Sequence, residues 1–577
     1  MRVSYRWLKE LVDFPFSPDE LAEHLTNLGL EVKEVEPFGK LEKITVGRVV
    51  SIQNHPDADR LKVVKVDTGG NIFSLVCGAP NIKEGLLVPV ALEGAIIHGG
   101  IKVKRAKIRG VESPGMICSE NELGLGEDRS GIMVLPSHLS LGANLSEALG
   151  LDDFVLDFEI TSDRADCLSV VGIAREISAL TGNLLHLPSG RVERERPKKM
   201  LPEIQIMHPD GCPYYSACLI KGIKVGPSPL WLRQRIFLMG SKPVNNIVDV
   251  TNYVLWEMGQ PLHPFDYSSI EGEKIIVRRA KNNEVLTTLD GVQRKLDESM
   301  LVIADTKRAI ALAGIMGGEN TQVQERTQDV LLESAYFDPI SIRRTSMRLN
   351  LTTEASYRFE RGVNPSGVKM ALNRVSFLLQ KIACVKLEGE IIERGKLSER
   401  KKWVFLRSSR VNRILGGRIP VSRMREILEN LQFGIKEDKD GWRVAIPSFR
   451  TDVEREIDLV EEIARFYGYN RLRLSLPSLG DEEQREDRKE IGGKRAREIL
   501  KGLGFYEVIG VSLVGEDFFK KANLPIKEGL KIRNPLSNQQ RILRTHLFPS
   551  LLGIASYNLN QNIEECRIFE LGNVYKR

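Results

Sequence analysis

The sequence has few cysteines, and none of them are spaced for a metal or redox site. The seven cysteines stand at 77, 118, 167, 212, 218, 384 and 566, and no Cys-x-x-Cys pair occurs. An odd, scattered set of this kind is typical of reduced thiols rather than of a disulfide framework or a zinc site. No apolar run approaches the ~18–20 residues of a membrane-spanning helix, and residues 1–14 lack the apolar core of a signal peptide. The sequence therefore predicts a soluble, cytoplasmic protein that does not enter a membrane.

A large excess of one charge is also missing. Lys plus Arg number 83 and Asp plus Glu number 77, which gives a net charge of +6. This mild balance permits nucleic-acid binding by local patches but does not require it. Aromatic residues make up 6% of the chain, and Phe73 is the single one between 41 and 150. A chain of 577 residues, at about 150 residues per domain, predicts roughly four domains.

The first 186 residues predict one domain inserted into another. Residues 17–20 (SPDE) show an N-cap, a first-turn proline and a capping-box glutamate, and the helix that follows ends at Gly29. Residues 41–150 hold short β-rich runs separated by Gly, Pro, Asn and Asp, which is typical of a small barrel. Residues 151–186 indicate a strand and a helix. We therefore expect 1–40 and 151–186 to form a split α/β domain around a small barrel at 41–150.

The rest of the chain divides at two charged stretches. Residues 187–203 are rich in proline and charge and indicate a linker, whereas 478–495 indicate a second linker or an exposed helix. The sequence further predicts a mixed α/β region at 200–395, helices around an Asp440-Gly441 hairpin at 400–476, and a final α/β region at 496–577.

A basic segment near the end of the predicted barrel is the first candidate for binding. The cationic side chains are those of Lys102, Lys104, Arg105, Lys107 and Arg109. Their phase switches within the segment, which predicts one strand with a bulge near Arg105. Since single-strand binders stack bases on aromatic rings, and this region has only Phe73, RNA contacts here would be with backbone phosphates. A solvated strand face explains the same pattern.

Several polar segments flanked by small residues form the second candidate. They are VDVTNY (248–253), GQPLHPFD (259–266), ALAGIMGGE (311–319), LLESAYFD (331–338) and TTEASYRFERG (352–362). His263 and Glu333 are candidates for a titratable pair in one pocket. A single His and a single Glu seventy residues apart are more often structural, so spacing alone leaves both interpretations open.

An acidic helix at 451–469 is the third candidate. Asp452 is a plausible N-cap, and Asp458, Glu461 and Glu462 share one helix face at i, i+3 and i+4. Carboxylates near a helix N-terminus complement the helix dipole. They are also the ligands that Mg²⁺ prefers together with water, so the pattern permits a Mg²⁺ site that needs ligands from another chain.

Taken in order, these segments resemble the beta subunit of bacterial phenylalanyl-tRNA synthetase. HPDADRLKVVKVD, VCGAPN, RGVESPGMICSENELGLGED and TSDRADCLSVVGIAREISALTG resemble the family's amino-terminal third. The five polar segments resemble its editing module. PSFRTDVEREIDLVEEIARFYGYN, NPLSNQQRILRTHLFPSLL and IFELGNVY extend the resemblance over essentially the whole chain.

The resemblance implies an α₂β₂ phenylalanine–tRNA ligase. Its alpha subunit carries the catalytic site for ATP, phenylalanine and the 3′ end of tRNA(Phe). The beta subunit is implied to be a multidomain α+β protein with an inserted OB-fold barrel, an α/β editing module of the B3/B4 type, a winged-helix-like domain and a degenerate class II synthetase-like core. The family continues beyond the segments matched here, so a C-terminally incomplete chain is expected.

The resemblance also implies residue roles. A pocket shaped for phenylalanine rejects its hydroxylated analogue tyrosine by only about 100-fold, so a second site must hydrolyse Tyr-tRNA. Glu333 matches the residue that receives the phenol, and His263 matches the editing histidine. Other pocket-lining positions are matched by Thr251, Asn252, Gly318, Thr353 and Ala355. The four carboxylates Asp452, Asp458, Glu461 and Glu462 match a Mg²⁺ site shared with the alpha subunit.

Two residues depart from the family pattern. Pro264 stands where alanine usually follows the histidine, and it restricts the backbone of His263. Lys242 stands where arginine is common, and lysine lacks the bidentate fork of arginine. The basic segment leaves a second functional hypothesis open, a non-catalytic tRNA-binding or assembly subunit that has lost editing.

Overall fold

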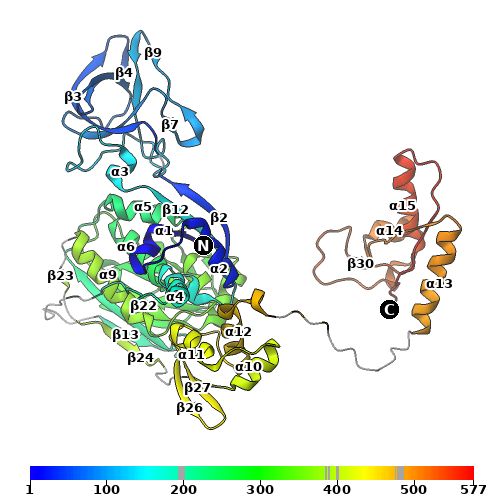
Figure 1. Ribbon diagram of the computed structural model, residues 1–577. Helices are drawn as coiled ribbons and strands as arrows, with labels where there is room; N and C mark the ends of the chain where they lie inside the picture. Colours follow the sequence, from blue (N-terminus) through cyan, green and yellow to red (C-terminus); the bar gives the residue numbers. More distant parts are fainter. Residues whose placement is uncertain are drawn as a thin grey trace. The chain divides into compact units, whose positions relative to one another are not determined.

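The computed structural model describes residues 1–39, 41–190, 192, 202–383, 386–387, 390–397, 402–472, 474, 476 and 487–577. The chain forms two compact units, Met1–Arg473 and Leu474–Arg577 (Figure 1). Within the described part, no helix is both long and apolar enough to cross a membrane. Six of the seven cysteines are described and are free thiols, as predicted, whereas Cys384 lies outside the described residues.

A three-stranded antiparallel sheet joins segments from both sides of the barrel. Strand β12 (Asp153–Glu159) lies between β1 (Arg2–Ser4) and β2 (Glu31–Phe38). Helices α1 (Tyr5–Leu11) and α2 (Pro18–Asn27) pack against this sheet, and α4 (Val170–Thr181) packs on α1. The chain between β2 and β12 is thus an insertion in this small domain.

The predicted start of α2 is confirmed in detail. The Ser17 hydroxyl accepts a hydrogen bond from the Glu20 backbone N–H, and the Glu20 carboxylate accepts one from the Ser17 backbone N–H at 2.8 Å. Pro18 occupies the first helical position, where its missing N–H costs nothing. Gly29, with φ of 89°, follows the last turn as predicted.

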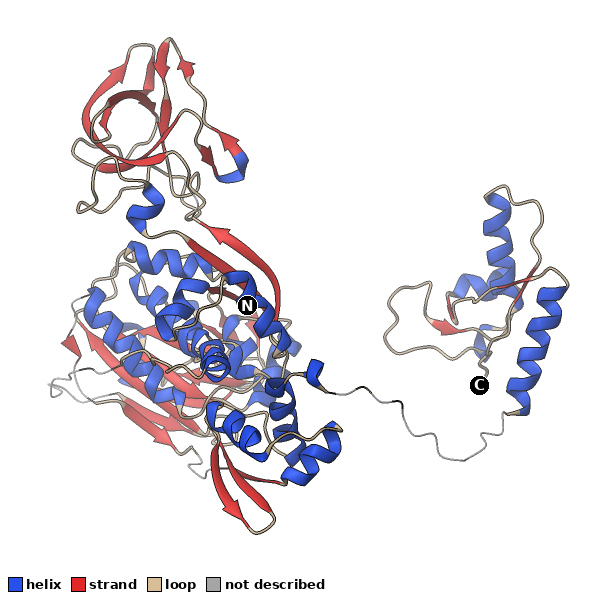
Figure 2. Ribbon diagram, viewed as in Figure 1, coloured by secondary structure: helices blue, strands red, loops and turns tan. Residues whose placement is uncertain are grey.

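The inserted region is a rolled five-stranded sheet (Figure 2). Its strands, in the order β11-β6-β3-β4-β5, are Gly115–Ile117, Leu87–Leu92, Ile44–His55, Ala58–Asp67 and Ile72–Cys77. The edge strands β11 and β5 contact each other, so the sheet closes on itself. Gly47 on β3 permits the tight curvature, because a Cβ there would lie only 2.5 Å from Val66 and 2.7 Å from Val90. The helix α3 (Leu145–Leu149) follows the barrel.

The predicted basic strand with a bulge is wrong. Residues 101–109 instead form two short strands, β8 (Ile101–Lys102) and β9 (Ala106–Ile108). They belong to separate hairpins, with β7 (Ile96–Ile97) and β10 (Val111–Ser113) respectively. The chain breaks between them because the buried Val103 anchors into the barrel core while Lys104 and Arg105 stay exposed.

Residues 202–397 contain two five-stranded sheets with a shared core. The first has the order β13-β16-β19-β20-β21, with bounds Glu203–Ile206, Lys274–Arg279, Leu301–Ala304, Ala309–Leu312 and Met316–Gly317. The second has the order β15-β22-β14, with bounds Leu262–Asp266, Val330–Tyr336 and Tyr214–Lys221, and both β23 (Lys386–Leu387) and β24 (Ile392–Gly395) pair with β14.

The two faces of the second sheet belong to different cores. One face packs against the first sheet through Tyr215, Phe265 and Leu331. The other face, with Cys218 and Leu332, packs into a core that also holds side chains of helices α6 (Asn246–Met258) and α9 (Gly367–Ala383). The remaining helices of this region are α5 (Leu230–Leu238), α7 (Pro339–Leu349) and α8 (Glu354–Phe359). A further hairpin pairs β17 (Val285–Thr287) with β18 (Gln293–Lys295).

Residues 402–472 form a small three-stranded sheet with helices. The strand order is β25-β27-β26, with bounds Lys402–Leu406, Gly441–Ile446 and Gly434–Asp438. The predicted hairpin is present, but its turn is Lys439-Asp440, and Gly441 is the first residue of β27. The helices are α10 (Ser408–Leu415), α11 (Val421–Asn430) and α12 (Glu456–Tyr467).

The second unit has a parallel and an antiparallel strand pair and three helices. Strand β28 (Tyr506–Glu507) pairs with β31 (Ile568–Phe569), and β29 (Leu513–Val514) pairs with β30 (Ile542–Leu543). The helices are α13 (Arg488–Gly502), α14 (Glu516–Lys521) and α15 (Phe548–Asn560). Helix α13 buries none of its side chains, which agrees with an exposed helix in the second charged stretch; residues 478–486 of that stretch lie outside the described residues.

Candidate functional site

A small cavity of about 60 Å³ lies between the two sheets of the 202–397 region. Strands β15, β20, β21 and β22, the turn before β21 and helix α8 contribute its walls. The lining residues are Pro261, Leu262, His263, Ile303, Ala311, Leu312, Gly314, Ile315, Met316, Gly317, Glu333, Ala355 and Phe359. The wall is mostly apolar, with two titratable side chains, His263 and Glu333.

Strand pairing brings these two side chains together. On the antiparallel pair β15–β22, His263 is the direct register partner of Glu333. Directly opposed residues point to the same face of a sheet, with Cβ atoms about 4.5–5.5 Å apart. The two predicted residues are seventy positions apart in the sequence, but they lie on neighbouring strands and line the same cavity.

Glu333 is a buried carboxyl group with one hydrogen-bond partner. Its exposed fraction is 5%, and the Tyr215 hydroxyl donates to its Oε2 atom at 3.2 Å. Burial raises the pKa of Glu333 to about 8, and the Tyr215 hydrogen bond offsets only part of that rise. The group is therefore mostly protonated at neutral pH, so it both donates and accepts hydrogen bonds.

His263 is held as a neutral ring. Burial lowers the pKa of His263 to about 4. Phe265 packs edge-on against the imidazole with ring centroids 4.5 Å apart. The Nε2 atom is buried and has no hydrogen-bond partner among the described residues. An orphaned buried polar atom that lines a cavity favours a ligand or water at that place.

Gly317 allows the imidazole to lie where it does. A Cβ at this position would lie 2.2 Å from Cε1 and 2.4 Å from Nε2 of His263. No L side chain fits that distance, so the ring packs directly on backbone. The sequence motif GIMGGE indicated that glycine is needed near the site, but it did not distinguish Gly317 from the neighbouring Gly318.

Helix α8 supplies the opposite wall. Its N-cap is Thr353, whose hydroxyl accepts from the Ser356 N–H at 3.1 Å and donates to the Ile315 carbonyl at 2.8 Å. This bond ties the helix start to the turn before β21. Ala355 in the first turn lines the cavity, whereas Thr353 acts as the anchor behind it.

Besides Thr353, three predicted pocket residues do not line this cavity, namely Thr251, Asn252 and Gly318. Thr251 and Asn252 lie on α6, whose apolar side chains belong to the core on the other face of the second sheet, and the Thr251 hydroxyl donates to the Val248 carbonyl within its own helix. Gly318 lies one residue beyond the lining and packs against the Ile310 carbonyl. Tyr215 was missed by sequence reasoning, because only the β14–β22 register brings it to Glu333.

The four predicted carboxylates are in different environments. The prediction of Asp452 as the N-cap is wrong, because α12 begins at Glu456 with Arg455 as its N-cap and Asp452 lies before the helix. Arg450 binds both Asp452 and Glu462, with closest distances of 2.7 and 2.6 Å. Asp458 accepts the backbone N–H groups of Glu454 and Arg455. Glu461 is exposed, and its pKa is raised by partial burial and by nearby Glu462.

These four carboxylates do not assemble into a metal site within the described residues. The one trio of His, Cys, Asp or Glu ligand atoms found within 4.8 Å of each other there is Asp166, Cys167 and Glu176. That trio is neutralised by arginine, since Arg164 binds both of its carboxylates. Only Asp458 and Glu461 stay outside the Arg450 pairs, so the predicted Mg²⁺ set does not fit as a site built by this chain.

A buried ion network instead joins α12 to α4. Arg465 pairs with Glu462 on its own helix and with Glu176 on α4, and all three side chains are at most 6% exposed. The arginines hold the pKa of Glu462 far below its usual value despite burial. Removing one member of a buried ion pair leaves a buried charge with less compensation, which destabilises the folded state.

The five basic barrel residues are all exposed. Arg105 pairs with Glu93 and Glu112 at 3.6 and 3.2 Å. Arg109 has a positive φ of 43° and turns the chain into β10. Lys102, Lys104 and Lys107 project from two hairpins rather than from one strand.

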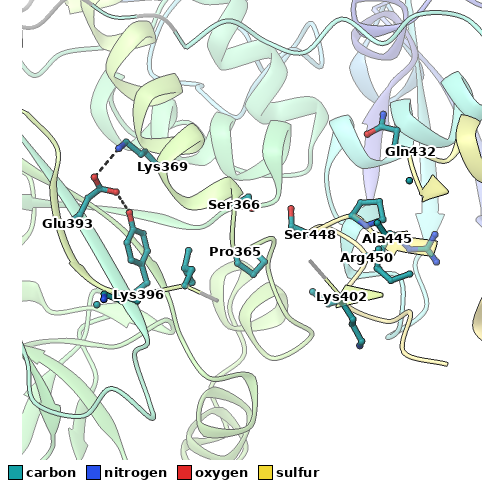
Figure 3. A pocket seen from close by; sticks show the side chains of 17 residues that line it. Pro365, Ser366, Lys369, Glu393, Lys396, Lys402, Gln432, Ala445, Ser448 and Arg450 are labelled. Carbon is teal, nitrogen blue, oxygen red and sulfur yellow. Dashed lines mark hydrogen bonds and ion pairs between the residues drawn. The ribbon is translucent and has the colours of Figure 1, made fainter. Parts of the chain in front are cut away.

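A larger open cleft of about 1160 Å³ lies between α9, β24 and the β25–β27 sheet (Figure 3). Four of its charged groups, Lys369, Glu393, Lys402 and Arg450, are paired within the chain. Lys369 binds Glu393 at 2.9 Å, and the Tyr214 hydroxyl donates to the same carboxylate. Because most of its charged groups already have partners, the cleft is a weaker candidate site than the small cavity.

Four family models match the chain in sequence. They are the putative tRNA binding domain (44–144), the B3/4 domain (211–384), the tRNA synthetase B5 domain (404–469) and the phenylalanyl tRNA synthetase beta chain CLM domain (473–577). All lining residues of the small cavity fall within the B3/4 match.

Curated relatives decide the family. The phenylalanine–tRNA ligase beta subunit of Syntrophus aciditrophicus is 44% identical over all of this chain and 73% of its own length. The beta subunit of Moorella thermoacetica gives the same identity and coverage. This chain belongs to the phenylalanine–tRNA ligase beta subunit family. The B3/4 domain is the editing module of phenylalanine–tRNA ligase, so the His263–Glu333 cavity lies within an editing module.

Among solved structures, an N-terminal fragment of the phenylalanyl-tRNA synthetase beta subunit from Pyrococcus horikoshii matches 81% of this chain and 99% of its own. It is 14% identical, with a TM-score of 0.35.

Proposed function

We propose that the His263–Glu333 cavity hydrolyses Tyr-tRNA(Phe) while the chain serves as beta subunit of a phenylalanine–tRNA ligase. The observation that carries the proposal is the buried carboxyl group of Glu333 beside an unpaired imidazole nitrogen in one apolar cavity, where burial raises the pKa of Glu333 to about 8. Tyrosine differs from phenylalanine by one hydroxyl group, and a buried polar group is the means by which a site favours the hydroxylated form.

The size of the cavity suits the tyrosyl ring. One water needs about 10–15 Å³ of such space, so 60 Å³ holds roughly four to six waters, close to the volume of a phenol. In this hollow the phenol exchanges hydrogen bonds with Glu333. Phenylalanine would leave the carboxyl without that partner, at a cost of about 1–3 kcal/mol.

His263 positions the reacting end rather than acting as a strong base. With a pKa of about 4 it is neutral at physiological pH, so its ring nitrogens can hydrogen-bond to water or to the 3′-terminal ribose. Water adds to the ester carbonyl, the bond to the ribose oxygen breaks, and tyrosine and the free 3′-hydroxyl of the RNA are released. Orientation of water supplies much of the acceleration in such a site.

The remaining modules support the complex. We infer an OB-fold for the rolled sheet at 41–150, with Lys102, Lys104, Arg105, Lys107 and Arg109 as contacts to tRNA phosphates. The sheet at 402–472 is inferred to be winged-helix-like, and 496–577 to begin a class II synthetase-like core. We infer from the family that the chain works in an α₂β₂ complex in the cytoplasm, in which the alpha subunit binds ATP and phenylalanine. A Mg²⁺ shared with the alpha subunit would use Asp452, Asp458, Glu461 and Glu462, of which Arg450 holds Asp452 and Glu462 in this chain.

Deacylation by the assembled complex tests the proposal. The wild-type chain with its alpha subunit should release tyrosine from Tyr-tRNA(Phe) much faster than phenylalanine from Phe-tRNA(Phe). Glu333→Ala should lower that preference about 10- to 100-fold, the equivalent of about 1.4–3 kcal/mol. An unchanged preference would remove Glu333 from the site.

A non-catalytic role in tRNA binding or assembly is the second candidate. The exposed lysines of the barrel hairpins favour it, because they supply charge without any chemistry. A complex that binds tRNA with a steep salt dependence but does not deacylate Tyr-tRNA would establish this role instead.

A further inference from the structure

The turn between β17 and β18 lies at the edge of the cavity. The Leu289 N–H donates to the Gly317 carbonyl at 3.0 Å, and Thr288 forms a β-bridge with Gly318. A Cβ on Gly317 would lie 3.2 Å from Leu289 Cδ1 and 2.2 Å from His263 Cε1. A single glycine therefore separates the Leu289 methyl group from the imidazole of the proposed site.

The turn is held in one shape by its own side chains. The Thr288 hydroxyl donates to Asp290 at 2.6 Å and accepts from Arg294 Nε at 3.0 Å, and Arg294 pairs with Asp290. Gly291 takes a φ of 75°, which closes the turn. Because these bonds lie within the turn, they hold Leu289 in a fixed position beside the opening of the cavity.

Leu289 and Val292 are nevertheless exposed. Their exposed fractions are 39% and 46%. Covering exposed apolar side chains on a rigid, hydrogen-bonded turn with a flat apolar surface lowers the free energy of the complex. Leu289 lies across Gly317 from His263, and Val292 follows on the same turn, so a ligand that leaves the cavity on this side meets Leu289 first.

The size of the cavity identifies what reaches out. A hollow of about 60 Å³ holds the tyrosyl ring but not the nucleoside to which it is esterified. The ribose and the adenine must then lie outside, along the rim. An adenine has a flat face, and packing that face on aliphatic side chains removes apolar surface from water.

We propose that Leu289 and Val292 form a platform for the 3′-terminal adenine of the mischarged tRNA. This inference rests on the proposed editing function and adds a positioning site to it. The platform binds the base, the cavity binds the phenol, and the ester between them lies over Gly317 beside His263. Leu289 touches the nucleoside but takes no part in proton transfer.

Two non-hydrolysable probes separate the base from the amino acid. One is 3′-tyrosylamino-3′-deoxyadenosine, and the other carries the same amide on a ribose that lacks the base. Their dissociation constants are measured with the assembled α₂β₂ complex, with excess phenylalanine occupying the aminoacylation site. Binding that is lost in Glu333→Ala is assigned to the cavity.

Leu289→Ala should weaken cavity binding of the adenosine probe about tenfold, which corresponds to about 1.4 kcal/mol, and leave the base-free probe unchanged. Val292→Ala should act in the same direction. Val285→Ala is the matched control, because Val285 is 59% exposed on the same hairpin but pairs with Lys295 at the end away from the turn. It should bind both probes as the wild type does.

Two results would overturn the platform. Equal weakening of both probes by Leu289→Ala would place Leu289 against the amino acid, and unchanged binding of both would show that the base lies elsewhere. If neither probe binds the wild-type cavity, the proposed function itself fails, and that result is distinct from the other two.

Discussion

Replacing Glu333 with glutamine should make the stability of the protein less sensitive to alkaline pH. The folded-state pKa of Glu333 is about 8 because the carboxyl group is buried, against a reference value of 4.5. A raised pKa means that the folded state holds the proton more tightly than the unfolded state does. The stabilisation is complete below about pH 4.5 and is lost as pH rises through about 8.

The size of the effect follows from the shift. Between about pH 6 and about pH 9 the wild type should lose roughly 3 kcal/mol of its free energy of unfolding through this one group. Glutamine keeps the shape and the hydrogen bond with Tyr215 but does not titrate. The difference between wild type and Glu333→Gln cancels the contributions of all other titrating groups.

Urea unfolding at a series of pH values measures that difference. The wild-type free energy should fall relative to the variant up to about pH 8 and then level off. A difference that stays flat with pH would mean that Glu333 ionises normally, and the argument for a protonated carboxyl in the cavity would be wrong. Tyr215→Phe is a useful companion, because loss of its hydrogen bond should raise the Glu333 pKa further.

Three further changes give separate tests. Gly317→Ala places a Cβ 2.2 Å from the His263 ring, so Tyr-tRNA deacylation should fall at least tenfold while aminoacylation by the complex stays constant; equal loss of both would indicate misfolding instead. Arg465→Met removes one of the two arginines that pair with each of Glu176 and Glu462, leaves the buried network one positive charge short, and should lower the free energy of unfolding by about 3–5 kcal/mol in urea titrations; a change below 1 kcal/mol would contradict the importance of the network. Lys107→Ala should lower the slope of log affinity for tRNA against log salt by about 0.7–0.9, whereas Arg105→Ala, whose charge is already paired, should change it less; equal slopes for both variants and the wild type would exclude the hairpins from the RNA contact.

Local signals in the sequence were sufficient where the structure depends on neighbouring residues. The capping box at 17–20 and the hairpin near Asp440-Gly441 depend on residues within a few positions of each other; the capping box is present as predicted, and the hairpin turn lies one residue earlier, at Lys439-Asp440. The prediction of one basic strand at 101–109 was wrong because Val103 is buried in the barrel core, and this tertiary contact interrupts the strand.

The candidate site depended on information that periodicity does not contain. Only the register of β15, β22 and β14 places His263 and Tyr215 next to Glu333, and no local pattern reports that register. Resemblance to the family indicated His263, Glu333 and Ala355, which share the cavity. It also indicated Thr251, which the structure places on a helix whose core lies across the second sheet.

The position of bound tyrosine in a crystal structure of the assembled complex tests the central claim most directly. The account predicts a phenol oxygen at hydrogen-bond distance from the Glu333 carboxyl group, with the amino-acid backbone directed toward His263. Tyrosine seen only outside this cavity, with Glu333 still bonded to Tyr215 alone, would contradict it.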